Sequence, residues 1–192
     1  TAGSVKNAIS VLGLKDEQVL IISGDVLTDI NLSNAIEFHN KRKSKATIVL
    51  TRSKNPLQFG IVITNEKGKI TRFLEKPTWG EVFSDTINTG IYILDPEVLN
   101  MIPYREEFDF SKDLFPAMLE KDMGLYGYIT DGYWRDVGNL NEYQEAHFDC
   151  LAHKVELQIE GNQLWSSFIG EGTTLKTKQE NLIGNVCIGK NC

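Results

Sequence analysis

The sequence predicts a layered α/β domain followed by the start of a parallel β-helix. Strand-like apolar runs alternate with helical patterns over residues 3–52, and β-rich arms joined by turns dominate residues 59–138. Ile-Gly pairs then recur after residue 155. Strands that alternate with helices are typical of parallel crossover units around a buried sheet. We therefore expect one domain at residues 1–154 and the beginning of another at residues 155–192.

The first part of the chain alternates between helix and strand. The spacing of its apolar residues predicts a helix from near Gly3 to near Gly13, followed by a strand over residues 18–23. A second helix is expected at residues 32–40 and a second strand at residues 46–52. β-Branched and leucine residues fill the first strand, which suits a strand covered on both faces in a parallel sheet.

The middle of the chain favours strands with short helices between them. Residues 59–77 read as a hairpin with its turn near residues 65–68, and residues 85–95 read as a strand that ends before a short helix opened by Pro96. Helical spacing returns after residue 110, with Ser111 as the expected N-cap and Pro116 as a bend. The remaining elements are two short strands and an amphipathic helix, at residues 125–130, 132–138 and 140–154.

Composition excludes several classes of protein. The net charge is −6 and the pI about 5.1, which argues against a nucleic-acid or membrane-surface partner. No apolar stretch reaches the roughly 20 residues that span a bilayer, so we expect a cytoplasmic protein. Cys150, Cys187 and Cys192 contain no C-x-x-C pair, which disfavours a zinc site or a disulfide framework.

Ile-Gly pairs mark the last part of the chain. They occur at residues 169–170, 183–184 and 188–189, each followed by a polar residue. Short repeats of this kind indicate the coils of a parallel β-helix, whose turns must stack to bury their apolar faces. About three coils are needed for stability, so we expect the native protein to continue beyond Cys192 and to use this region for oligomerisation.

Three strand ends carry residues suited to chemistry. Asp25 follows the apolar run at residues 19–22, Glu75 and Lys76 end a β-rich arm, and Asp136 ends the segment "YWRD". Ligands of open α/β sheets bind beyond the carboxyl ends of the strands, where Asp25 stands. An ordinary structural interpretation also fits, because Asp caps helices and shapes turns and exposed Glu-Lys pairs are common.

Six motifs occur in one order along the chain: "TAGSVKNA", "ISGDVLTDI", "FGIVI", "FLEKP", "INTGIYIL" and "GYWRDVGNLNEY". In order and spacing they resemble the sugar-1-phosphate nucleotidylyltransferases, with the bacterial mannose-1-phosphate guanylyltransferase-like branch most similar. The resemblance covers almost the whole chain. It implies a Rossmann-like, GT-A-like mixed sheet and a left-handed parallel β-helix after the catalytic domain.

The resemblance also implies roles for the residues of these motifs. Asp25 and Asp136 would bind the catalytic Mg²⁺, Lys76 would contact the sugar phosphate, and Glu75 would bind sugar hydroxyls. Substrate contacts are further implied for Thr1, Ala2, Gly3, Gly24, Gly60, Asn88, Thr89 and Gly90. Two structural alternatives stay open: Gly60 as a hairpin glycine and residues 88–90 as a turn at a strand end.

The implied reaction joins a nucleoside triphosphate, expected to be GTP, to a sugar-1-phosphate, expected to be mannose-1-phosphate. A sugar phosphate is already anionic at neutral pH, so no general base is needed. The difficulty lies in bringing two anions together, which Mg²⁺ on two carboxylates and a lysine would relieve.

The family's Gly-rich phosphate loop, which follows its first strand, is absent from residues 1–192. We therefore expect no turnover from these residues by themselves, and a sheet that lacks its first strand. Two alternatives stay open: uridylyl or thymidylyl transfer to glucose-1-phosphate, and a related module that binds or regulates without catalysis.

Overall fold

The computed structural model describes residues 1–14, 16–75, 78, 84–176, 178 and 184–192. These residues form two compact units. The first unit contains residues 1–24 and 30–132, and the second contains residues 25–29 and 133–192.

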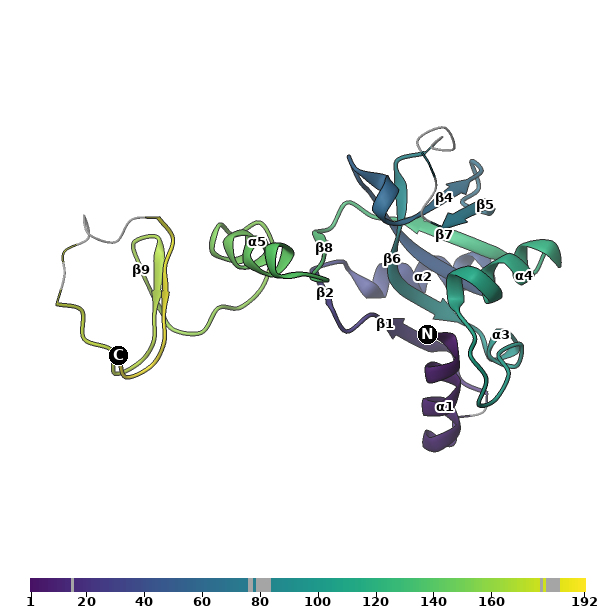
Figure 1. Cartoon of the computed structure of the whole chain (residues 1–192), viewed down its shortest axis with the longest axis horizontal. Coiled ribbons are helices and arrows are strands. Elements are labelled where there is room, and N and C mark those ends of the chain that lie inside the picture. Colours follow the sequence, from purple (N-terminus) through teal and green to yellow (C-terminus); the bar gives the residue numbers. More distant parts are fainter. Residues whose placement is uncertain (15, 76–77, 79–83, 177, 179–183) are drawn as a thin grey trace. The chain divides into compact units, whose positions relative to one another are not determined.

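A mixed sheet forms the centre of the first unit (Figure 1). Its path runs β5-β4-β6-β3-β7, and β1 also pairs with β6. The strands are β1 Val19–Ile22, β3 Ala46–Arg52, β4 Gly60–Thr64, β5 Ile70–Glu75, β6 Thr86–Leu94 and β7 Leu125–Ile129.

Antiparallel pairing predominates in this sheet, so the parallel sheet expected from the alternation of strands and helices is wrong, whereas the mixed sheet implied by the family resemblance is confirmed. β3 pairs with β7 in parallel, whereas β1, β3 and β4 all pair with β6 in the antiparallel sense. β4 and β5 form the predicted hairpin, which reverses the chain direction and favours antiparallel neighbours. The sequence pattern identified the strands but carried no information about the direction of their partners.

Strand β1 is covered less completely than its apolar sequence predicts. Val19 and Ile21 pack against the main core, whereas the side chains of Leu20 and Ile22 are 39% and 43% exposed. The prediction of burial on both faces is therefore wrong for the described structure. An apolar run shows that a strand can be buried, but the neighbouring elements decide which of its faces is covered.

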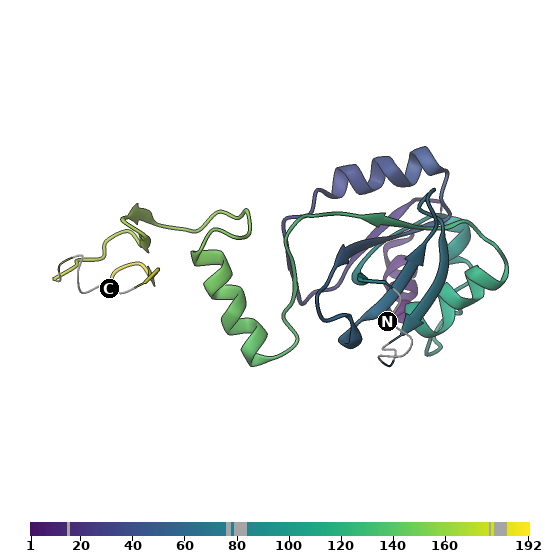
Figure 2. The same cartoon turned by 90° about the horizontal axis from the view of Figure 1, so that it is seen from above.

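Helices cover both faces of the sheet (Figures 1 and 2). Alternate residues of β3, Ala46, Ile48 and Leu50, lie in a core shared with α1 Ala2–Leu12 and α4 Phe115–Glu120. On the opposite face lies α2 Leu32–Arg42, where the buried His39 ring makes a 2.8 Å hydrogen bond with Thr47 Oγ1. The alternation of side chains along one strand thus separates two packing layers.

The start of α4 differs from the prediction. The N-cap is Asp109, whose Oδ1 accepts the backbone N–H groups of Ser111 (2.9 Å) and Lys112 (3.1 Å). A π-helical turn, Phe110–Leu114, precedes Pro116 in the first turn of α4. The assignment of Ser111 as the N-cap is wrong because the carboxylate two residues earlier reaches two unpaired backbone donors at once.

Aromatic side chains join this helix to the sheet. The Phe115 side chain is fully buried, and its ring centroid lies 5.1 Å from Tyr92, 5.8 Å from Phe110 and 5.8 Å from Phe73. Edge and tilted contacts at these distances stabilise aromatic clusters beyond their buried area. The cluster therefore fixes α4 against β5 and β6.

The second unit begins with a two-stranded ribbon. β2 Val26–Thr28 pairs with β8 Trp134–Asp136 in the antiparallel sense. Helix α5 Leu140–Leu151 follows, with Asn139 accepting the Glu142 backbone N–H as its N-cap (3.0 Å). β2 was not expected from the sequence, because three residues are too few to show the alternation of apolar and polar side chains that marks a strand.

Three short strands end the chain: β9 Asn162–Leu164, β10 Ser167–Ile169 and β11 Cys187–Ile188. β10 pairs with β11 in parallel and aligns Ile169 with Ile188, whereas β9 pairs with β10 in the antiparallel sense. One parallel pair does not make a coil stack, so the β-helix stays a prediction.

None of the helices in the described residues combines the length and the apolar composition that a membrane-spanning helix needs.

We expect Phe115→Ala to lower the free energy of unfolding by about 3–5 kcal/mol, because it empties the centre of the aromatic cluster. Urea unfolding followed by circular dichroism measures this loss. Phe148→Ala is the matched control, since Phe148 is 54% exposed, and it should change stability by less than about 1 kcal/mol. Equal losses in the two variants would contradict the assigned core.

Candidate active site

The β2–β8 ribbon brings together the backbones of the two aspartates that the sequence predicts as metal ligands. Val26 stands opposite Asp136, and the Val137 backbone N–H donates to the Asp25 carbonyl oxygen (2.8 Å). Asp25 and Asp136, distant in sequence, are thus one ladder step apart. Asp25 is exposed and Asp136 is half-buried.

The donor set suits Mg²⁺, which proteins usually hold through one or two carboxylates with substrate phosphates completing the coordination. In the part of the chain that the structure describes, no group of three His, Cys, Asp or Glu residues could hold a metal ion. Metal binding by Asp25 and Asp136 stays a prediction.

Asp29 holds the other end of the ribbon. Its Oδ1 accepts the Tyr133 backbone N–H (2.7 Å) and its Oδ2 accepts the Glu156 backbone N–H (2.9 Å). The Thr28 hydroxyl donates to the Tyr133 carbonyl oxygen (2.7 Å). These contacts are needed because a ribbon of two short strands is only marginally stable by itself.

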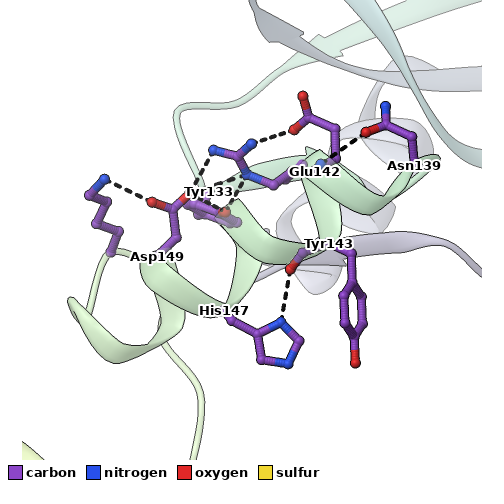
Figure 3. Close-up of polar contacts among 8 residues, drawn as sticks. Tyr133, Asn139, Glu142, Tyr143, His147 and Asp149 are labelled. Carbon is purple, nitrogen blue, oxygen red and sulfur yellow. Dashed lines mark hydrogen bonds and ion pairs between the residues drawn. The ribbon is translucent and has the colours of Figure 1, made fainter. Parts of the chain in front are cut away.

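A charged network fixes β8 to α5 (Figure 3). Arg135 Nη2 donates to Asp149 Oδ2 (2.7 Å), and the Tyr133 hydroxyl donates to the same oxygen (2.7 Å). Lys154 Nζ donates to Asp149 Oδ1 (2.7 Å), and Arg135 Nη1 also pairs with Glu142. The Asp149 side chain is 4% exposed, so both of its oxygens depend on these partners.

The hydrogen bonds of this network, together with burial, shift the pKa values of Asp149 and Tyr133. Burial opposes ionisation of Asp149, but hydrogen bonds from Lys154, Tyr133 and Arg135 outweigh it and lower the pKa of this carboxyl to about 2. Burial and the hydrogen bond to Asp149 raise the pKa of the Tyr133 hydroxyl to about 12. Asp149 is therefore ionised, and Tyr133 neutral, across the physiological pH range.

A cavity of about 550 Å³ opens in the first unit beside β6. Strand ends and the start of the π-helical turn surround it, and its main polar lining residues are Ser23, Glu75, Tyr92, Asp109, Ser111 and Lys112. The size is that of a small-molecule site. Glu75, which the sequence predicts as a sugar ligand, therefore lines a pocket, whereas Lys76 lies outside the described residues.

Gly60 makes room for Glu75. The two residues are register partners in the β4–β5 hairpin, and a Cβ on Gly60 would lie 2.9 Å from Glu75 Oε2 and 3.0 Å from the Phe73 ring. The glycine of β4 thus leaves room for the Glu75 side chain of β5. Gly60 stands in the hairpin, and its approach to a substrate stays a prediction.

Residues 88–90 lie inside β6, at a bulge between Asn88 and Tyr92, rather than in a turn at a strand end. Between Ile48 and Leu50 the β3–β6 register shifts, and the Thr89 hydroxyl donates to the Val49 carbonyl oxygen (2.7 Å). Gly90 has a φ of +75°, and a Cβ there would lie 2.6 Å from Ser23 Oγ. Bulges of this kind re-aim side chains beside active sites.

Asn88 shapes this bulge with both ends of its amide. Its Oδ1 accepts the Gly90 backbone N–H (3.0 Å), and its Nδ2 donates to the Tyr92 hydroxyl (3.0 Å). Burial raises the pKa of Tyr92 to about 12, which keeps this hydroxyl neutral. Asn88 and the buried Thr89 thus have evident structural partners, and contact with a substrate stays a prediction for both.

Asp109 ties the beginning of α1 to the cavity. Its Oδ2 accepts the Thr1 hydroxyl (2.7 Å), and the Gly3 N–H donates to the Phe108 carbonyl oxygen (3.0 Å). Burial opposes ionisation of Asp109, but hydrogen bonds from Thr1 and from two backbone N–H groups lower the pKa of its carboxyl. The Ala2 side chain is fully buried, so any contact of Ala2 with a ligand is left to its backbone.

Residues 1–153 match the family described as Nucleotidyl transferase. The chain belongs to the nucleotidyl transferase family. The resemblance inferred from six motifs is therefore confirmed.

The chain is similar to two named relatives in particular. It is 34% identical over 164 residues to a UTP–glucose-1-phosphate uridylyltransferase of Synechocystis, covering 84% of this chain and 42% of the relative. It is 32% identical over 206 residues to a mannose-1-phosphate guanyltransferase of Schizosaccharomyces pombe, covering 100% of this chain and 50% of the relative. The chain thus spans about half the length of these relatives.

The fold agrees with a solved structure. HddC from Yersinia pseudotuberculosis superposes with a TM-score of 0.62 at 23% identity, over 76% of this chain and 60% of HddC. This similarity supports the mixed α/β fold of the chain.

Sequence reasoning missed several residues of this nucleotidyl transferase. Asp109 could have been found, because an aspartate two residues before Ser111 is an equally good helix cap. Ser23 and Tyr92 lie inside two of the six motifs, but neither residue was singled out there. Asp29 and Asp149 read as ordinary surface carboxylates, and their partners are distant in sequence or face them only after folding.

We expect Gly3→Ala to destabilise the protein by about 1–3 kcal/mol, because the new Cβ would lie 2.6 Å from the Glu106 backbone oxygen. Alanine otherwise favours a helix by about 1 kcal/mol, so the steric effect must exceed that gain. Gly24→Ala is the control, since no atom lies within 4 Å of its Cβ position. Urea unfolding compares the two, and a Gly3→Ala variant as stable as wild type would contradict the packing described here.

The free energy of unfolding should fall in acid, because Asp149 becomes protonated. The folded carboxyl has a pKa of about 2, below its ordinary value of 3.8, so its contribution is present above pH 4 and is lost as the pH falls towards 2. The loss amounts to about 2 kcal/mol. Urea unfolding between pH 2 and pH 6 should show a steeper decline for wild type than for Asp149→Asn, and Asp16→Asn, an exposed control, should follow wild type. Parallel curves for all three proteins would refute this assignment.

Proposed function

We propose that the protein transfers a nucleotidyl group from a nucleoside triphosphate to a sugar-1-phosphate in a Mg²⁺-dependent reaction that yields a nucleotide sugar and pyrophosphate. The observation that carries this proposal is the β2–β8 pairing, which sets Asp25 and Asp136 one ladder step apart. GTP and mannose-1-phosphate are the substrates proposed first, because the relative from S. pombe is named for guanylyl transfer to mannose-1-phosphate.

In this proposal, one pair of residues binds the metal and other residues bind the substrate. Asp25 and Asp136 would hold Mg²⁺, which supplies charge neutralisation around the phosphates. A phosphate oxygen of the sugar-1-phosphate attacks the α-phosphorus, forming one P–O bond while the bond to pyrophosphate breaks. The attacking oxygen is already anionic, so the protein needs to supply no base.

The sugar-1-phosphate is held by residues at the end of β5. Glu75 lines the cavity of the first unit and offers a carboxylate to sugar hydroxyls. Lys76 is assigned to the sugar phosphate on the resemblance of the "EKP" motif to the family. A lysine suits this role because it is a compact charge on a flexible stem.

Uridylyl or thymidylyl transfer to glucose-1-phosphate is the second candidate. The relative from Synechocystis, named as a UTP–glucose-1-phosphate uridylyltransferase, favours it. We further propose that residues 155–192 begin a left-handed β-helix that contributes to oligomerisation, with Ile169 and Ile188 in adjacent coils. A location in the cytoplasm completes the proposal.

The test uses the native polypeptide that contains this sequence. Pyrophosphate release is measured with Mg²⁺ for GTP, UTP or dTTP, each paired with mannose-1-phosphate or glucose-1-phosphate. We expect one pair to dominate, and Asp25→Asn and Asp136→Asn each to lower kcat by about 10²–10³, the usual effect of removing one electrostatic contact. Asp122→Asn, whose side chain is 80% exposed in a surface ion pair, should keep wild-type rates.

Two results would overturn the proposal. Near wild-type turnover in both aspartate variants would remove the metal role of Asp25 and Asp136. No pyrophosphate from any pair, despite binding of a nucleotide sugar, would indicate a binding or regulatory module instead.

A further inference from the structure

Arg135 stands directly before Asp136 in β8, on the opposite face of the ribbon, because successive side chains of a strand alternate. Its Nε donates to the Tyr133 hydroxyl (3.0 Å) and to Asp149 Oδ2 (3.1 Å), and its Nη2 donates to the same carboxylate oxygen (2.7 Å). Nη1 pairs with Glu142. The planar guanidinium is thus held in one orientation.

All the carboxylates of this network belong to helix α5. Asp149 and Glu142 lie two turns apart on that helix, so one arginine contacts it at two levels. The Arg135 side chain is 25% exposed and the Asp149 side chain 4% exposed. Removing one partner of such a pair leaves a charge with little access to water, so each partner depends on the other for its position.

The ribbon requires such a support. β2 and β8 have three residues each, and within the described residues they pair with each other and with no third strand. A two-stranded ribbon of this length is marginal in water. A metal site, in contrast, needs its carboxylates held to within about 0.5 Å.

We propose that Arg135 and Asp149 are positioning residues for the metal carboxylate of Asp136. The ion pair fixes β8 on α5, and through the backbone of β8 it holds Asp136 beside Asp25. This inference rests on the proposed function, since it assigns a purpose to the network only if Asp25 and Asp136 bind a metal.

The test measures Mn²⁺ binding to the native polypeptide by water-proton relaxation at 10 °C, with folding checked by circular dichroism. We expect Arg135→Lys and Asp149→Asn to weaken Mn²⁺ affinity by about 10-fold or more, the usual effect of removing an outer-sphere partner. The Mg²⁺ concentration for half-maximal turnover should rise by the same factor, and the KM for the sugar-1-phosphate should stay unchanged.

Lys154→Gln is the matched control. It removes an ion pair from the same Asp149 carboxylate at a side chain that is 64% exposed, and it leaves the Arg135 contacts in place. Its Mn²⁺ affinity should stay within about 2-fold of wild type. If Asp149→Asn fails to fold, Glu142→Gln takes its place, since the Glu142 side chain is 41% exposed, and the expected loss is then several-fold.

Asp25→Asn separates this inference from the proposed function. Unchanged Mn²⁺ affinity in Asp25→Asn would remove the metal site itself. Loss of affinity in Asp25→Asn, together with wild-type affinity in folded Arg135→Lys and Asp149→Asn, would overturn the positioning role and leave the proposed function intact. A lower Tm in the network variants without a change in Mn²⁺ affinity would likewise show a structural role and no positioning.

Discussion

Strand β6 must satisfy its hydrogen bonds along both edges, and the site of the first unit depends on how it does so. On one edge its partner changes from β4 at Ile87 to β1 at Ile91, while on the other edge it pairs with β3 throughout. The bulge at residues 89–91 accommodates this change. Gly90 takes a left-handed conformation there, and Ser23 donates its backbone N–H to the Gly90 carbonyl oxygen (3.1 Å). The cavity opens beside this interruption.

The second unit meets a different constraint. The β2–β8 ribbon is too short to be stable through its backbone hydrogen bonds alone. Side-chain contacts therefore stabilise it at both ends. Asp29 caps one end by accepting two backbone N–H groups, and the Arg135–Asp149 pair attaches β8 to a helix. Charged groups suit this purpose because their hydrogen bonds are directional and strong when water is excluded. The carboxylates of Asp29 and Asp149 thus hold the ribbon that carries Asp25 and Asp136.

Several features were predictable from local patterns. The α1 helix ends at Gly13 in the left-handed conformation, the short helix α3, Pro96–Leu99, begins with Pro96, and the β4–β5 hairpin turns at residues 65–68, as their residue types require. The motif residues Asp25 and Asp136 were also identified, but by resemblance, since each alone is an ordinary turn residue. The N-cap of the π-helical turn was misassigned because Asp109 and Ser111 are both good caps, and only the folded backbone distinguishes them.

The sequence by itself determined the family, most of the described strands and helices, and the charged residues at strand ends, because these depend on composition, period and motif order. The tertiary structure decided the antiparallel direction of the sheet, the incomplete cover of β1, the bulge in β6 and the pairing of β2 with β8. Each of these is a contact between segments far apart along the chain. Hydrogen bonds and buried charges select such contacts by geometry, which a linear pattern of residue types does not contain.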